Sequence, residues 1–228
     1  MGGGMMGDKR LHRTLKVAAF AVTAIVITGL FAARVAFVNA AALSYPVERH
    51  ALGSRVELAG SYAEYKTENT DGLSMTVTGA RRMSCSQYLD EYVSDRSSYD
   101  SFPDDKTDMD ALTLLVLDIE IANNKQDESD RGYLDSIGWS VVPDEARELW
   151  LRVDHALFGA SVPQIDGAFQ LSVKPGTTFT VHVPFDALLN KRFPAGMTDM
   201  YRPALDAGSY SFTVTNIPVR HVVDVEVK

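Results

Sequence analysis

The sequence contains one cysteine, Cys85, in 228 residues, so a disulfide bond within the chain is excluded. A domain without disulfides that works outside the cell has to be held together by its hydrophobic core. The chain also lacks a Gly-x-Ser-x-Gly elbow, a Ser-x-x-Lys motif and any cysteine with a recognisable catalytic signature. We therefore expect a protein that is not an enzyme and that needs no cofactor.

Positive charge is scarce and unevenly distributed. The chain has 22 Lys and Arg residues against 30 Asp and Glu residues, a formal net charge of −8. The first 34 residues have a net charge of +4, from Asp8 and five basic residues: Lys9, Arg10, Arg13, Lys16 and Arg34. The remainder therefore carries −8 − 4 = −12. An acidic body does not suit nucleic acid, because phosphate binding depends on Lys and Arg.

One long uncharged hydrophobic run occupies residues 17–33. Together with residues 34–43 it is long enough to cross a hydrocarbon core of about 30 Å as a helix. The basic residues before it place residues 1–16 in the cytoplasm and the body outside. We predict a transmembrane helix over residues 17–43 that is retained as a membrane anchor. The small residues at 39–42 also fit a signal-peptide cleavage site, and in that alternative the body is secreted.

Beyond Tyr45 the hydrophobic pattern has a period of two, which is typical of half-buried strands. The predicted strands cover residues 55–62, 73–77, 115–121, 169–173, 179–185, 210–214 and 223–227, with weaker signals at 139–142 and 149–153. The Pro-Gly sequence at 174–177 predicts a tight hairpin turn. We expect an all-β fold, an immunoglobulin-like antiparallel β-sandwich over residues 54–228 after a short linker at 44–53. A barrel is the alternative.

Residues 112–185 contain the segments LTLLVLDIEIANN, GYLDSIGWSVVPDEARELW and AFQLSVKPGTTFTVHVPF. These segments resemble the uncharacterised immunoglobulin-like domains of bacterial lipoproteins and membrane-anchored surface proteins. In that family a strand ends in paired Asn, and a Pro-Gly turn precedes an aromatic and hydrophobic strand. The resemblance implies the fold and the location and supplies no reaction. The chain departs from the family in lacking a lipid-modified cysteine and a long Ser/Gly-rich linker.

The long segments 84–110 and 187–207 are insertions on this plan. Loops on a rigid scaffold often carry binding residues. The first insertion contains four aromatic residues that we predict to form a partner-binding surface: Tyr88, Tyr92, Tyr99 and Phe102. The expected partner is a protein or an envelope polymer.

The first insertion also contains four closely spaced carboxylates: Asp104, Asp105, Asp108 and Asp110. Calcium prefers six to eight oxygen ligands, so this loop is a candidate calcium site, although it lacks EF-hand spacing. The five histidines show no metal-ligand spacing along the sequence.

Together these features predict a membrane-anchored extracytoplasmic interaction module of unknown specificity. The alternative is a calcium-dependent ligand-binding domain or an envelope hydrolase built on the acidic loops.

Overall fold

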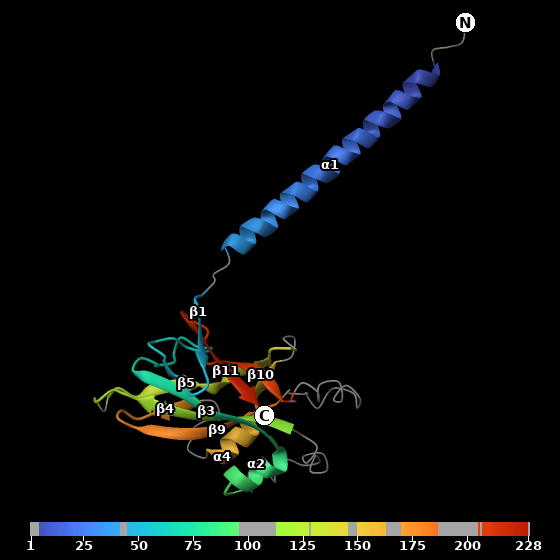
Figure 1. Ribbon diagram of the computed structural model, residues 1–228. Coiled ribbons are helices and arrows are strands. Elements are labelled where there is room, and N and C mark those ends of the chain that lie inside the picture. Colours follow the sequence, from blue (N-terminus) through green and yellow to red (C-terminus); the bar gives the residue numbers. More distant parts are fainter. Residues whose placement is uncertain are drawn as a thin grey trace. The chain divides into compact units, whose positions relative to one another are not determined.

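The computed structural model describes residues 5–41, 45–95, 113–127, 129–145, 150–162, 170–186, 205 and 207–227 (Figure 1). The chain divides into two compact units, Met1–Ser44 and Tyr45–Lys228. The predicted residues Tyr99, Phe102, Asp104, Asp105, Asp108 and Asp110 lie outside the described residues.

The first unit contains one helix, α1 (Met5–Ala41). Its segment Ala18–Asn39 has 22 residues with a mean hydropathy of 2.1, and none of this segment is buried. Apolar side chains such as Phe20, Ile25 and Phe37 are more than 70% exposed. The predicted hydrophobic helix is therefore present, with the length and composition of a signal anchor or a signal peptide.

The second unit is mostly β. The main sheet has nine strands in the order β1-β11-β10-β6-β7-β9-β4-β3-β2, and β5 and β8 form a separate two-stranded sheet. The strands are β1 (Val47–Ala51), β2 (Arg55–Glu57), β3 (Leu73–Ser84), β4 (Thr113–Asn123), β5 (Gly132–Asp135), β6 (Ser140–Pro143), β7 (Leu151–Val153), β8 (Gln170–Val173), β9 (Thr178–Asp186), β10 (Gly208–Thr213) and β11 (Arg220–Val227). Short helices occur at α2 (Cys85–Tyr92), η1 (Ser136–Gly138) and α4 (His155–Ser161).

The nine-stranded sheet folds back on itself. Five strands separate β11 from β3 in the sheet order, yet the two strands are in contact, and Figure 1 shows them side by side. The backbone N–H of Tyr62, after β2, donates to the carbonyl of Ile217, before β11, at 2.7 Å. One continuous hydrophobic core includes Val56 from β2, Leu117 from β4 and Phe212 from β10. The two ends of the sheet thus enclose a common core, as the two layers of a sandwich do.

The predicted hairpin at residues 174–177 is wrong. The turn itself forms, with Gly176 at φ +67°, but β8 pairs with β5, and β9 pairs with β4 and β7. Gly176 N–H donates to the Asn123 carbonyl, and Asn123 N–H donates to the Thr177 carbonyl, both at 3.0 Å. The turn is therefore fixed by the end of β4 and carries the chain from the small sheet to the main one.

Part of the predicted linker at 44–53 is a strand. Val47–Ala51 form β1, which pairs in parallel with β11 at one edge of the main sheet. None of its five side chains is buried, so the sequence lacks the strict alternation of apolar and polar residues that marks a half-buried strand.

Candidate functional site

Helix α2 begins the first predicted insertion. The Ser84 hydroxyl accepts a hydrogen bond from Gln87 N–H at 3.1 Å, and the Gln87 side chain accepts one from Ser84 N–H at 2.8 Å. This reciprocal capping box satisfies two backbone donors at the start of the helix. One face of α2 is buried, and there Cys85 and Leu89 pack into a second hydrophobic cluster that includes Leu114 of β4. The helix is therefore fixed at its start and along one face.

Tyr88 is buried on that inner face of α2. Its side chain is 0% exposed, and its hydroxyl lies 2.6 Å from the carbonyl oxygen of His182 and 2.8 Å from Ser161 Oγ. Burial raises the pKa of the Tyr88 hydroxyl, which therefore stays protonated and can donate. Tyr88 supports α2 from beneath and does not form part of an exposed partner surface, so only Tyr92 of the predicted aromatic set is both described and accessible.

Four side chains, which we name the α2 cluster, gather at the end of this helix: Arg81, Tyr92, Asp118 and His182. The Tyr92 ring stacks on the His182 ring at a centroid distance of 4.2 Å and an interplanar angle of 22°. His182 Nδ1 lies 2.6 Å from Asp118 Oδ1, and Arg81 Nη2 lies 3.1 Å from the same oxygen. The Arg81 guanidinium carbon lies 5.4 Å from the centre of the Tyr92 ring. The Tyr92 ring, the His182 ring and the end of the Arg81 guanidinium are thus each held by a neighbour.

The register of the main sheet creates this cluster. Asp118 of β4 is paired with His182 of β9 on one side and with Gly79 of β3 on the other, next to an irregularity between Val77 and Gly79. A Cβ atom on Gly79 would lie 2.7 Å from Asp118 Oδ2. Gly79 therefore leaves the room in which the Asp118 carboxylate turns towards His182 and Arg81.

Replacing Gly79 with alanine is expected to lower the free energy of unfolding by about 1–3 kcal/mol, because the carboxylate has to move. Chemical denaturation of the full chain in detergent measures the change. The same substitution in an Asp118→Ala background removes the colliding group and is expected to cost less than half as much. Equal costs in the two backgrounds would show that the Asp118 contact is not the cause.

An open depression of about 440 Å³ borders α2. Its lining residues are Arg82, Met83, Gln87, Asp90 and Glu91. Glu91 also accepts a hydrogen bond from the Tyr92 hydroxyl at 2.6 Å, which links the depression to the α2 cluster. The surface around the end of α2 is therefore shallow, carries both signs of charge and contains an oriented Tyr and Arg.

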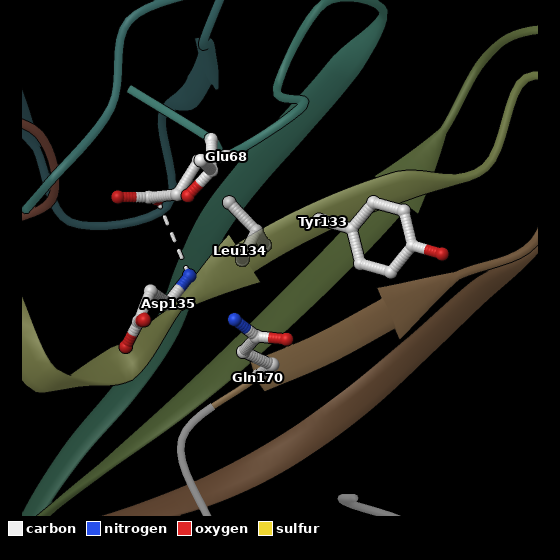
Figure 2. Close-up of a pocket in the computed structure, with 6 residues that line it drawn as sticks. Glu68, Tyr133, Leu134, Asp135 and Gln170 are labelled. Atoms are coloured by element: carbon white, nitrogen blue, oxygen red, sulfur yellow. Dashed lines mark hydrogen bonds between the residues drawn. The ribbon is translucent and has the colours of Figure 1, made fainter. Parts of the chain in front are cut away.

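A smaller pocket of about 240 Å³ lies between the loop after β2 and the small sheet (Figure 2). Figure 2 shows Glu68 on one side and Tyr133 and Gln170 on the other. Glu68 Oε1 accepts hydrogen bonds from the backbone N–H groups of residues 63, 64 and 65 at 2.9–3.1 Å, and Oε2 accepts one from Asp135 N–H at 3.2 Å. Burial raises the pKa of Glu68, and the four hydrogen bonds oppose this shift. With four donors already bound, Glu68 acts mainly as a clamp on the loop.

Two histidines that are far apart in sequence meet in the structure. His50 Nε2 of β1 lies 3.2 Å from His221 Nδ1 of β11, although 171 positions separate the two residues. Burial, the larger effect, lowers the pKa of His221, nearby Glu48 raises it and nearby His50 lowers it. Sequence spacing gave no sign of this pair. If Val47–Ala51 had been recognised as a strand, its geometry would have placed Glu48 and His50 on one face, but nothing in the sequence would have added His221.

No curated protein matches the chain. Among solved structures, a secreted protein from Mycobacterium tuberculosis, MPT63, is similar to it at 12% sequence identity and a TM-score of 0.39. That similarity covers 81% of this chain and 99% of the mycobacterial one. The family described as "Domain of unknown function (DUF5028)" matches residues 47–221, which include strands β1 to β10 and the first two residues of β11. The chain therefore belongs to the DUF5028 family.

Proposed function

We propose that this protein is a membrane-tethered binding domain, with an immunoglobulin-like body outside the cytoplasmic membrane, that recognises a protein partner through the surface around the end of α2. The single observation that carries the proposal is the pre-oriented α2 cluster beside an open depression. The proposed role is binding, without catalysis.

The apolar helix supports the tether. The segment Ala18–Asn39 has 22 residues with a mean hydropathy of 2.1, and none of it is buried, so it has a strong preference for a lipid environment. The basic residues precede it, and Tyr45 and the body follow it, so the positive-inside rule directs the body outwards. The acidic charge of the body keeps it soluble there and disfavours adsorption to anionic lipid.

The composition of the α2 surface supports a protein partner. Tyr and Arg are enriched among the residues that dominate protein interfaces, and Tyr92 and Arg81 stand together here. Stacking on His182 holds the Tyr92 ring, so little conformational entropy remains to be lost on binding. An open depression with charges of both signs suits a complementary polar surface better than a small apolar ligand.

A cysteine placed on the α2 surface tests two things: whether the body lies outside the membrane, and whether this surface contacts a protein partner. The native Cys85 is 0% exposed, so of the two cysteines in the Gln87→Cys variant the introduced one is the accessible thiol on α2. Ser172→Cys, on an exposed position of β8, is the matched control. In intact cells that naturally produce the protein, a membrane-impermeant maleimide is expected to label both full-length variants. Labelling that requires lysis would contradict the outward orientation.

A benzophenone maleimide attached to the same thiols then reports the partner. Light is expected to give a cross-linked band of discrete mass from position 87 and none from position 172. Tyr92→Ala is expected to lower the yield of that band about tenfold or more, as the loss of an interface hot spot does. Identical bands from both positions, no band from position 87, or a polydisperse polymer smear would each reject the proposed protein-binding surface.

A further inference from the structure

Three potential metal ligands converge at the edge of the main sheet. Glu48 and His50 belong to β1, and His221 belongs to β11. In the parallel register of these strands Glu48 is paired with His221. Alternate residues of a strand share a face, so Glu48, His50 and His221 all project from the same side of the sheet.

Two of the three separations between ligand atoms are close to those around a tetrahedral ion. His50 Nε2 and His221 Nδ1 are 3.2 Å apart, and His221 Nδ1 and Glu48 Oε2 are 3.5 Å apart. One ligand atom from each residue lies within 4.8 Å of the others. Zinc bonds of about 2.0–2.1 Å in a tetrahedron hold neighbouring ligand atoms roughly 3.3 Å apart. The three side chains can therefore coordinate one ion with little rearrangement.

The surroundings also suit a cation. Arg49 and Arg220 flank the ligands along the strands, but the alternation of the strands directs them to the opposite face. Arg49 is paired there with Asp224. His221 is 5% exposed, and Glu48 is exposed, so an ion would contact a buried ring on one side and solvent on the other. Solvent access leaves a fourth position for water.

We propose that Glu48, His50 and His221 form a binding site for a divalent transition-metal ion of the zinc class. Two imidazoles and one carboxylate are a ligand set that zinc accepts in proteins. A direct hydrogen bond between the two rings is the competing explanation of the 3.2 Å distance. Only the metal site predicts that the chain binds one zinc ion.

The site would also fix the start of the body. β1 lies at the edge of the sheet and none of its side chains is buried, so few apolar contacts hold it. An ion bound by β1 and β11 would cross-link the first strand of the domain to the last. Zinc would therefore stabilise the attachment of the segment that directly follows the hydrophobic leader.

Titration of the full-length, chelator-treated chain in detergent with zinc chloride tests the site. Isothermal titration calorimetry is expected to give one zinc ion per chain with a micromolar or tighter dissociation constant. His50→Gln is expected to weaken binding at least about 100-fold, because the loss of even an outer-shell partner costs about 10–100-fold. Glu48→Gln should also weaken it, and His155→Gln, on α4, should leave it unchanged.

Thermal unfolding provides a second measurement that does not depend on heats of binding. Saturating zinc is expected to raise the melting temperature of the wild-type chain by about 5–10 °C. His50→Gln should lose this shift while keeping the melting temperature of the zinc-free wild type. The proposal is overturned if the wild-type chain binds zinc only at millimolar concentration, or if wild type, His50→Gln and Glu48→Gln bind it equally.

Discussion

Replacing Trp139 with alanine is expected to lower the free energy of unfolding by about 3–5 kcal/mol, the range for large aromatic residues in cores. Trp139 is 1% exposed, and its ring meets Phe212 edge-to-face at a centroid distance of 5.9 Å. Phe212 in turn contacts Phe185 at 5.6 Å. The substitution would leave a cavity beside Phe212 of β10 and Phe185 of β9 in the hydrophobic core. Urea denaturation followed by circular dichroism measures the loss.

The second tryptophan is a matched control. Trp150 is 56% exposed, and its main described contact is the Arg152 guanidinium at 5.5 Å. We expect Trp150→Ala to change the free energy of unfolding by less than about 1 kcal/mol. If both substitutions cost the same, the core does not have the arrangement described above.

Replacing Glu68 with alanine is expected to cost about 3 kcal/mol of unfolding free energy, because four backbone donors lose their acceptor together. These donors hold the loop at residues 63–65 and the end of β5 to one carboxylate. Glu64 is exposed and close in sequence, so Glu64→Ala is the control and is expected to stay within about 0.5 kcal/mol of wild type. A small effect of Glu68→Ala would show that water can accept the four backbone hydrogen bonds as well as the Glu68 carboxylate does.

The difference in unfolding free energy between wild type and Glu68→Ala is expected to depend on pH. Burial raises the pKa of Glu68 above its usual value of 4.5, so the folded state binds the proton more tightly than the unfolded state. The corresponding contribution to stability is fully present below pH 4.5 and is lost as the pH rises through the folded-state pKa. The difference in stability between wild type and Glu68→Ala should therefore narrow from pH 4 to pH 7.

The features that local physics controls were predictable from the sequence. An uncharged run before the body predicts α1, because an apolar helix is recognised by its own composition. Alternation at 115–121 and 179–185 predicts β4 and β9, because a strand with one buried face repeats every two residues. The turn at Gly176 was likewise predictable from its Pro-Gly sequence.

The candidate sites depend on contacts that local sequence does not encode. Alternation defines the two faces of a strand but does not determine which strand lies beside it, so the partner of β8 was mispredicted. Tyr88 was predicted to lie on a partner-binding surface because it belongs to the first insertion, and only packing against β4 and α4 shows that its ring is buried.

The sequence by itself determined the apolar leader, the acidic body and the β character, because composition and short-range periodicity control all three. Only the tertiary structure decided that Asp118 lies beside His182 and that His50 lies beside His221. These pairs are 64 and 171 positions apart. Strand register over such separations is set by the free energy of the whole core, to which every strand contributes.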